Sequence, residues 1–268
     1  MNYIIFAFIF IFGLIIGSFL NCLVWRLHTK EKMSGRSRCP KCKKQIAWYD
    51  NIPVLSFILL TGKCRHCGQT ISWQYPAVEI ITGLLFILAV ISNLKLVTWN
   101  DLNLVSLSVD YRLQIAIVRD WFIVAVMIVI FIYDLRWYLI LDIVTLPAAA
   151  LVFIINLILG FNWQSLFISG IIGVGFFLIQ FLVSRGKWIG GGDIRLGLLM
   201  GVALGRLDYL ITAIFLAYLA GSVIGVGLIT TGKKKWGSAL PLGVFLSAAT
   251  TVTLFWGNKI IDWYFGWF

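Results

Sequence analysis

Residues 186–205 read GKWIGGGDIRLGLLMGVALG, and they place a carboxylate, Asp193, directly after three glycines and at the head of an apolar run. Gly197, Gly201 and Gly205 follow at four-residue spacing, which puts all four positions on one face of a helix. A stripe of glycines lets a neighbouring helix approach closely inside a membrane. The stretch therefore predicts a helix whose first carboxylate faces a seam between packed helices.

This helix is short for a membrane span. From 193 to 205 it would cover about 18 Å at 1.5 Å per residue, against roughly 30 Å for a bilayer core. We expect Gly190, Gly191 and Gly192 to dip below the membrane surface, to carry Asp193 with them and to admit a substrate backbone. The plain alternative is that Asp193 caps the helix N-terminus.

The remainder of the chain is apolar enough to surround such a helix with others. Of its 268 residues, 60% are hydrophobic and 12% are charged, and several apolar runs approach the length that crosses a bilayer as a helix. The predicted fold is an all-α polytopic membrane protein. We expect about eight spans, at 3–25, 77–97, 115–134, 143–161, 165–184, 193–205, 207–230 and 239–257.

The basic residues predict the orientation of these spans. The net charge is +11, and the polar segment 26–75 and the connections at 184–187 and 231–237 are basic. The turn at 134–142 carries Arg136, whereas the loop at about 98–114, GFNWQ at 160–164 and GRLD at 205–208 are poor in bases, uncharged or balanced. Basic connections lie on the cytoplasmic side, so the alternation favours eight spans. It places Asp134, Asp142 and Asp193 at cytoplasmic membrane ends. Because the bases lie between apolar runs, we expect a lipid bilayer and no nucleic acid as partner.

Four cysteines in the polar segment predict a metal site. They form CPKC at 39–42 and CRHC at 64–67, and two C-x-x-C pairs can close a tetrahedral zinc site through Cys39, Cys42, Cys64 and Cys67. Two redox-active or unpaired thiol pairs are the alternative. The expected division is a first membrane helix over 1–25, a cytoplasmic zinc-ribbon-like loop over 26–75 and a transmembrane core over 76–268.

The acidic residues are few, and most have a plain interpretation. We expect Asp120 at the outer start of the third span, Glu79 at the start of the second, and solvated positions for the following acids: Glu31, Asp50, Asp101, Asp110, Asp208 and Asp262. Asp134, Asp142 and Asp193 lie near hydrocarbon, where a carboxylate is costly and is a functional candidate by default. An ion pair with Arg136 is the alternative for Asp134, and helix capping is the alternative for Asp142.

Two aspartates that face each other can share one proton, so that one activates water while the other protonates a leaving amide. This chemistry is aspartic proteolysis at a membrane edge. A Ser–His or Cys–His protease is excluded in practice, because both histidines, His28 and His66, lie in the polar segment.

Several stretches resemble one family. GGGD at 190–193 is similar to the G-x-G-D motif of intramembrane aspartic proteases. The chain further resembles the bacterial type IV prepilin leader peptidases, in order and over nearly its whole length. The stretches that carry this likeness are GSFLNCLVWRL (17–27), the segment 39–80 with both cysteine pairs, DLRWYLILD (134–142), GGGDIRLGLLMGVALG (190–205) and PLGVFLSA (241–248).

The resemblance implies a bifunctional enzyme of the bacterial inner membrane. Such an enzyme cleaves the basic leader of prepilins and pseudopilins at the cytoplasmic face, with an aspartate dyad that maps onto Asp134 and Asp193. It then N-methylates the new amino terminus with S-adenosylmethionine. Supporting roles are expected for Asp142, Arg195 and the three glycines Gly190, Gly191 and Gly192.

The chain departs from the family pattern at two places. It has Ile140-Leu141-Asp142 where the family often has I-P-D, and Arg195 where the family often has lysine. Neither change removes a catalytic group. For the methyl donor, no glycine-rich nucleotide fingerprint is present, and the resemblance points to the zinc loop and its surroundings. The candidates are Gly62, Lys63 and Glu79; Asp50 is better explained as a surface charge.

Two other functions fit the same composition. One is a non-enzymatic membrane protein, either a transporter or a pilus or secretion assembly scaffold with a zinc ribbon. The other is a presenilin-like peptidase, which would lack the zinc loop and would not methylate.

Overall fold

The computed structural model describes residues 2–94, 111–235 and 237–266, and the chain divides into two compact units, Met1–Asn100 and Asp101–Phe268. Within the described ranges, the secondary structure consists of helices and two isolated β-bridges. The predicted loop around 98–114, with Asp101 and Asp110, lies mostly outside the described residues.

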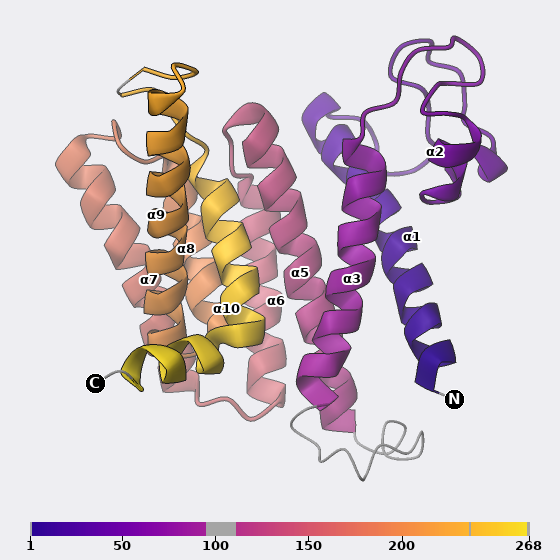
Figure 1. Cartoon of the computed structure of the whole chain (residues 1–268). Helices are drawn as coiled ribbons and strands as arrows, with labels where there is room; N and C mark the ends of the chain where they lie inside the picture. The colour runs from indigo at the N-terminus through magenta and orange to yellow at the C-terminus, as the bar shows by residue number, and fades with distance from the viewer. Residues whose placement is uncertain (1, 95–110, 236, 267–268) are drawn as a thin grey trace. The chain divides into compact units, whose positions relative to one another are not determined.

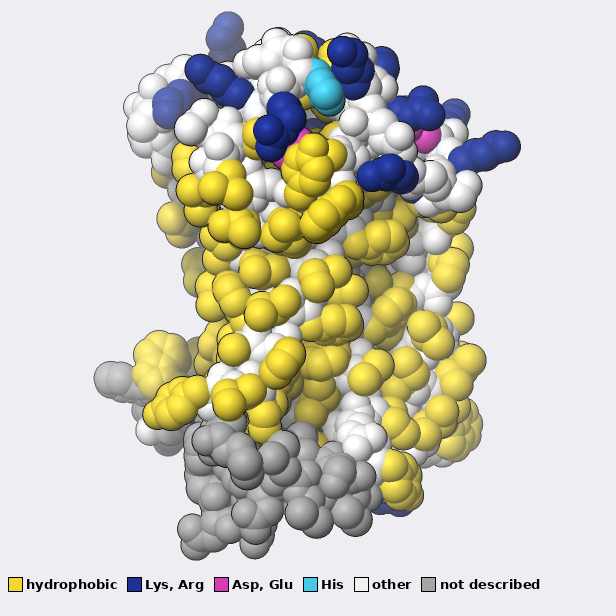
Figure 2. Space-filling view, turned by 90° about the vertical axis from the view of Figure 1, so that its right-hand side faces the viewer, with side chains coloured by type: hydrophobic (Ala, Val, Ile, Leu, Met, Phe, Trp, Pro, Cys, Tyr) yellow, Lys and Arg dark blue, Asp and Glu magenta, His cyan; other side chains and the backbone are white. Residues whose placement is uncertain are grey.

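The first unit pairs two long helices, α1 (Asn2–Thr29) and α3 (Gln74–Leu94), which lie side by side (Figure 1). Small residues make the close approach possible: a Cβ on Gly13 would lie 2.6 Å from the Cα of Gly83. Between these helices the chain forms the polar module, residues 30–73, with the 3-10 helix η1 (Trp48–Asn51) and the short helix α2 (Leu55–Leu59). Lys and Arg gather on this module, whereas hydrophobic side chains cover the helices (Figure 2).

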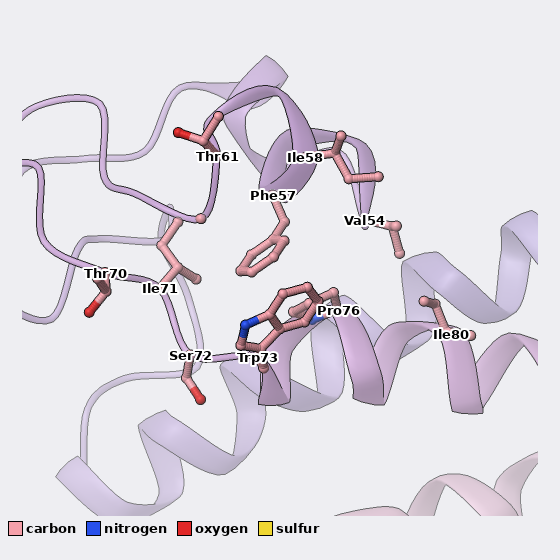
Figure 3. Close-up of a pocket in the computed structure, with 11 residues that line it drawn as sticks. Val54, Phe57, Ile58, Thr61, Thr70, Ile71, Ser72, Trp73, Pro76 and Ile80 are labelled. Atoms are coloured by element: carbon pink, nitrogen blue, oxygen red, sulfur yellow. The ribbon is translucent and has the colours of Figure 1, made fainter.

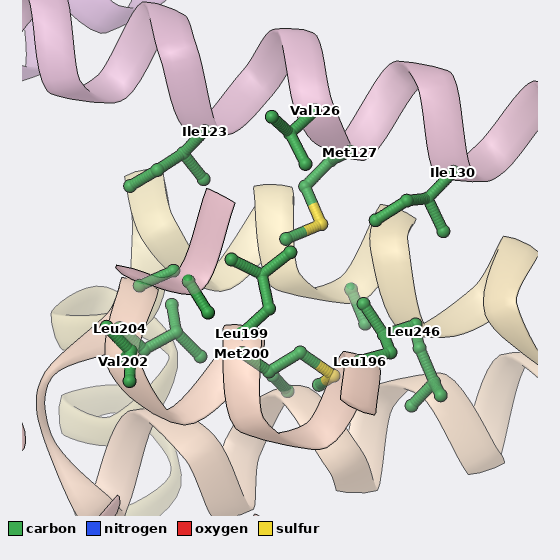
Figure 4. Packing of buried hydrophobic residues seen from close by; sticks show 14 of the residues in the cluster. Ile123, Val126, Met127, Ile130, Leu196, Leu199, Met200, Val202, Leu204 and Leu246 are labelled. Atoms are coloured by element: carbon green, nitrogen blue, oxygen red, sulfur yellow. The ribbon is translucent and has the colours of Figure 1, made fainter. Parts of the chain in front are cut away.

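In its described residues, the second unit is a bundle of six helices. They are α5 (Tyr111–Trp137), α6 (Asp142–Ile158), α7 (Trp163–Ser184), α8 (Gly191–Leu204), α9 (Leu207–Thr230) and α10 (Leu242–Phe265). The short helix α8 contacts α6, α7, α9 and α10. Its apolar side chains, among them Leu196, Leu199 and Met200, pack with Ile123 and Met127 of α5 in the core (Figure 4). Most of α8 is therefore buried among its neighbours.

As predicted, the glycine stripe of α8 allows a neighbouring helix to approach closely over most of its length. Gly197 faces Gly173 of α7, and Gly201 faces the backbone of Ser169 and Gly170. The prediction was wrong at the fourth position, because Gly205 does not continue the helix: it takes a left-handed conformation (φ 67°) and ends it. The helix also begins earlier than predicted, at Gly191.

Among the described residues, six helices are long and apolar enough to cross a membrane: α1, α3, α5, α7, α9 and α10. The chain is thus a multi-pass membrane protein by its helices. The other two predicted spans correspond to α6, with 17 residues, and α8, with 14, and the latter is about 21 Å long at 1.5 Å per residue. The total of eight stays a prediction.

Asp120 does not lie at the start of a span, as the sequence suggested. Helix α5 begins at Tyr111, so Asp120 is well inside it and buried. Its Oδ1 is 2.7 Å from Nη2 of Arg119, whose Nη1 donates to Asn156 of α6. Asn156 in turn donates to the carbonyl oxygen of Val202 in α8. This buried charge is paired, as a charge among apolar helices must be, and the network joins three helices.

We predict that Gly197→Ala destabilises the second unit by about 1–3 kcal/mol, the usual cost of an added methyl group in a packed core. The new Cβ would lie 2.5 Å from the carbonyl oxygen of Gly173 and 2.6 Å from the ring of Phe177. Denaturant titration of the purified protein in detergent measures the change. Gly175→Ala is the matched control, because a Cβ there meets nothing within 4 Å. Equal stability of the two variants would contradict the close packing.

Candidate active site and metal centre

Asp134 lies in the last turn of α5 with its carboxylate buried. Its Oδ2 accepts a hydrogen bond from the backbone N–H of Val244, at 3.1 Å, in the first turn of α10. Gly243 is required beside it, because a Cβ at that position would lie 2.9 Å from the same oxygen. The free N–H groups at a helix N-terminus favour an anion. The start of α10 therefore holds this carboxylate in place.

Asp193 is the third residue of α8 and is also buried. Its Oδ2 accepts a hydrogen bond from the backbone N–H of Gly190, at 2.9 Å. Asp193 is therefore not the N-cap residue, which is Gly190. Its carboxylate instead reaches back from the third helical position to the N–H of the N-cap residue, as the acidic residue of a capping box does. One bond of this kind does not use up the acceptor capacity of a carboxylate, so the group can cap the helix and still do chemistry.

The two aspartates come together at one end of the second unit. Ile140, in the connection between α5 and α6, packs against the glycines that lie beside the two aspartates, Gly192 and Gly243. A Cβ on Gly192 would lie 2.8 Å from the Cβ of Ile140, and a Cβ on Gly243 would lie 2.9 Å from its Cδ1. The carboxylates of Asp134 and Asp193 are near enough to interact electrostatically. The predicted pair from two separate helices is thus brought together.

The plain alternative for Asp134 is wrong. Arg136 lies over the ring of Trp137, with its guanidinium carbon 5.8 Å from the ring centre, and not against the carboxylate of Asp134. The reason is geometric, because residues two apart on a helix do not face each other.

Asp142 and Arg195 form a surface pair beside the buried one. Their side chains approach to 2.6 Å and are 50% and 44% exposed. The capping interpretation of Asp142 is wrong: Leu141 occupies the cap position without a side-chain bond, and Asp142 is the first residue of α6. The pair joins the first residue of α6 to α8 near its start, two residues after Asp193. It therefore links α8 to the helix that follows the Asp134 segment in the chain.

The three glycines before Asp193 do not share one role. Gly190 is extended and donates to Asp193, and Gly191 and Gly192 are helical. A Cβ on Gly192 would collide with Ile140, so packing favours glycine there, whereas a Cβ on Gly191 would meet nothing within 4 Å. Sequence reasoning missed Ile140 and the α10 amide at Val244. The only signal was PLG at 241–243, where a proline and a glycine mark a helix start close to its neighbours.

The four predicted cysteines meet in the polar module. The sulfur atoms of Cys39, Cys42, Cys64 and Cys67 all lie within 4.8 Å of one another. Tetrahedral zinc with Zn–S bonds of 2.3 Å requires sulfurs about 3.8 Å apart, and those of Cys39 and Cys67 are 4.0 Å apart. The donor set therefore fits one zinc ion. The four cysteines supply the four ligands that a closed structural zinc site needs.

The two cysteine pairs have the same local fold. In each pair the first cysteine accepts a bond from the residue four positions later, Lys43 or Gly68, which is left-handed (φ 60° and 67°). The short β-bridges Arg38–Gln45 and Lys63–Thr70 close these turns. Backbone N–H bonds from Cys67 and His66 lower the pKa of the Cys64 thiol to about 7. The pKa of the neighbouring Cys67 thiol is raised, in part by burial and by hydrogen bonds with the other sulfurs. Of these two thiols, Cys64 is therefore the one that more readily becomes a thiolate, the form that binds metal.

A cavity of about 710 Å³ lies beside the second cysteine pair, Cys64 and Cys67. It is bounded by α2, the turn at Thr61–Gly62, residues 70–73 and the start of α3 (Figure 3). The rings of Phe57 and Trp73 lie 4.8 Å apart along it. Volumes of 300–1,000 Å³ with apolar walls and a few polar groups are typical of small-molecule sites.

The residues predicted for the methyl donor differ in their relation to this cavity. Gly62 lines it, and its left-handed backbone and contact with Phe57 favour glycine. Glu79 is buried and accepts a bond of 2.7 Å from the N–H of Val54, which lines the cavity. Lys63 is not among the lining residues. Asp50 forms a bidentate ion pair with Arg65, which holds the pKa of that carboxyl below its usual range.

Comparison with known proteins follows the same division of the chain. Residues 11–93 match the Bacterial Peptidase A24 N-terminal domain, and residues 121–226 match the Type IV leader peptidase family. No solved structure matches the chain.

Curated relatives match nearly the full length. The chain is 30% identical over 257 residues to the prepilin leader peptidase/N-methyltransferase of Bacillus subtilis, covering 96% of each protein. The proteins of the same name from Aeromonas salmonicida (strain A449) and Vibrio cholerae are 29% and 33% identical, covering 98% and 76% of this chain and 95% and 79% of theirs. With this likeness over both units, the chain belongs to the type IV leader peptidase family.

Proposed function

We propose that this protein is a membrane aspartic endopeptidase that removes the leader of prepilins or pseudopilins and then N-methylates the new amino terminus. The observation that carries the peptidase half is the pair Asp134 and Asp193. Both are buried at one end of one helical bundle, and each is held by a backbone N–H. The names of the relatives, which cover nearly the whole chain, support both activities.

The chemistry follows from two carboxyl groups that share one proton. The ionised group accepts a proton from water as the water oxygen attacks the scissile carbonyl carbon. The protonated group donates its proton to the leaving nitrogen as the C–N bond breaks. The N–H groups of Val244 and Gly190 each keep one oxygen of a carboxylate in place, which leaves the other oxygens for water and substrate.

The charge distribution of the second unit supports a cytoplasmic active site in the bacterial inner membrane. Seven basic residues lie at the end of the bundle that carries the two aspartates. They are in the last turn of α5, near the start of α8, or in the α7–α8 and α9–α10 connections: Arg136, Arg185, Lys187, Arg195, Lys233, Lys234 and Lys235. Segments rich in bases stay in the cytoplasm. The leader of the substrate would then be cut where its apolar helix leaves the bilayer. Asp142 and Arg195 support the site by linking α6 to α8.

For the first unit, we propose a structural zinc ion on Cys39, Cys42, Cys64 and Cys67, and a methyl-donor site in the adjoining cavity. S-adenosylmethionine supplies an electrophilic methyl group for the freed amine. Phe57 and Trp73 offer ring faces to an adenine, and Thr61, Thr70 and Ser72 are polar residues of the lining. Gly62 keeps the turn beside Phe57 open, and Glu79 holds Val54 in place. Lys63 contributes only through the turn that it shares with Cys64.

We predict that Asp134→Asn and Asp193→Asn each reduce leader cleavage about a thousandfold or more, because an amide cannot exchange the shared proton. The double variant should be no worse than either single one, since the dyad works as a unit. Incubation of the purified protein with a prepilin, followed by mass spectrometry of the product, measures the reaction.

Asp208→Asn is the matched control, because that carboxylate pairs with Arg206 at the opposite end of the bundle. Full activity of Asp134→Asn would move its role to Asp142. Full activity of Asp193→Asn would exclude the aspartic mechanism, and a wild-type protein that cleaves no prepilin would favour a transporter or scaffold.

We predict one zinc ion per chain and its loss in Cys39→Ser, because a hydroxyl is a far weaker zinc ligand than a thiolate. Elemental analysis of the purified protein measures the metal. Methyl transfer should fall at least as much as leader cleavage. Cys22→Ser is the control, since Cys22 lies in α1 outside the cluster. A wild-type protein without zinc, together with normal activity in Cys39→Ser, would contradict the proposal.

We predict that Trp73→Ala weakens the binding of radiolabelled S-adenosylmethionine about tenfold, the scale of one lost aromatic contact, and leaves leader cleavage unchanged. Equilibrium dialysis measures the binding without any reaction. Trp48→Ala is the control, because Trp48 is an exposed tryptophan of the same module that does not line the cavity. Asp193→Asn should bind the donor like the wild type. Unchanged binding in both Phe57→Ala and Trp73→Ala would place the donor elsewhere.

A further inference from the structure

A second polar pair lies beside Asp193 on the outside of the second unit. The hydroxyl of Tyr218, in α9, donates a hydrogen bond of 2.8 Å to Oε1 of Gln180, in α7. The ring of Phe176 packs edge-on against the ring of Tyr218, with 6.0 Å between their centres. The phenol of Tyr218 and the carboxylate of Asp193 are near enough to interact electrostatically.

The packing of α7 against α8 shows how far along the bundle Gln180 lies. Gly201 faces Ser169 and Gly170, and Gly197 faces Gly173, so the two helices run antiparallel with matched steps of one turn. One further turn brings Asp193 to the level of Phe177. Gln180 is three residues beyond Phe177, which is less than one turn. The amide of Gln180 therefore lies at the depth of the catalytic carboxylate.

The pair stands on a surface that is otherwise apolar. Helices α7 and α9 are both candidate spans, and the residues next to the pair along them are exposed hydrophobic ones, Ile179 and Leu182 on α7 and Leu219 on α9. Tyr218 itself is 36% exposed. Polar groups that face hydrocarbon are costly and mark functional sites by default.

The hydrogen bond between the two side chains leaves capacity for a further partner. A glutamine amide carries two N–H donors, and Nε2 of Gln180 makes one long contact of 3.4 Å, with the carbonyl oxygen of Phe176. The phenol oxygen of Tyr218 donates to Gln180 and can still accept a bond. One donor and one acceptor thus remain available on the pair.

We propose that Gln180 and Tyr218 bind the backbone of the substrate next to the scissile bond; this rests on the peptidase activity proposed above for Asp134 and Asp193. A peptide bond must leave its helix before a carboxylate dyad can attack it. The N–H and C=O groups that are released then need partners, because no water supplies them in hydrocarbon. The free donor and acceptor of the pair supply such partners for an extended segment at the head of an apolar helix. Gln180 and Tyr218 are thus positioning residues for cleavage.

The test uses the full-length protein and a prepilin, with kcat and KM measured separately. Gln180→Met keeps the length of the side chain and Tyr218→Phe keeps the ring, so both should fold, as their unfolding temperatures will show. Each should raise KM about fivefold, the value of one hydrogen bond, and change kcat less than twofold. Ser222→Ala is the matched control, because that exposed hydroxyl of α9 bonds its own helix, at Leu219.

A substrate with one ester in place of an amide beside the scissile bond provides a second test. It distinguishes a direct bond between the pair and the substrate backbone from an indirect effect of the variants on helix packing. The ester lacks the N–H donor and is a weaker acceptor, so it should raise KM for the wild type and for Ser222→Ala. It should cost clearly less in Gln180→Met/Tyr218→Phe, where the partner groups are already gone.

Unchanged KM in both single variants, or an ester effect that is equal in all proteins, would overturn the docking role. Cleavage by the wild type would still stand in that case. Loss of all cleavage in the wild type would instead contradict the peptidase proposal itself.

Discussion

The close contact between α7 and α8 is the constraint on which the second unit depends. Gly173 and Gly197 allow two helix backbones to touch, and this lets a helix of 14 residues sit among four longer neighbours. Asp193 enters the apolar interior because it is fixed to that helix. A buried carboxylate is costly without hydrogen bonds, and the chain supplies them from its own backbone at Gly190.

The carboxylate of Asp134 is also bonded by a backbone N–H, which here belongs to another helix. Its carboxylate meets the first free N–H groups of α10, and Gly243 leaves the space for this approach. Ile140 packs beside both sites, while Asp142 and Arg195 join α6 to α8 at the surface. The burial of the three aspartates differs accordingly: Asp134 and Asp193 are buried and bonded by backbone N–H groups, whereas Asp142 is half exposed and paired with a cation. Similar residues in one stretch of sequence thus have two different environments.

The first unit has its own constraint, which is set by sulfur rather than by carboxylates. Two matching turns bring four thiols within reach of one ion, and the second turn is continuous with the wall of the cavity through Gly62 and Lys63. A metal at this point would stiffen a module that has little apolar core of its own. The two proposed reactions are thus assigned to separate units of the chain, each with its own source of rigidity.

The sequence by itself determined the membrane class, the two cysteine pairs, the helix after GGGD and the aspartates at helix ends. These are local properties: hydrophobic runs, ligand spacing and a four-residue period all act within a few turns. It did not determine that Asp142 pairs with Arg195, that Asp120 is buried and linked through Arg119 and Asn156 to α8, or that Val244 and Ile140 belong to the site. Those contacts join residues up to 110 positions apart. Only the packing of the helices decides them, because a side chain's partner depends on which faces meet, and no local pattern encodes that.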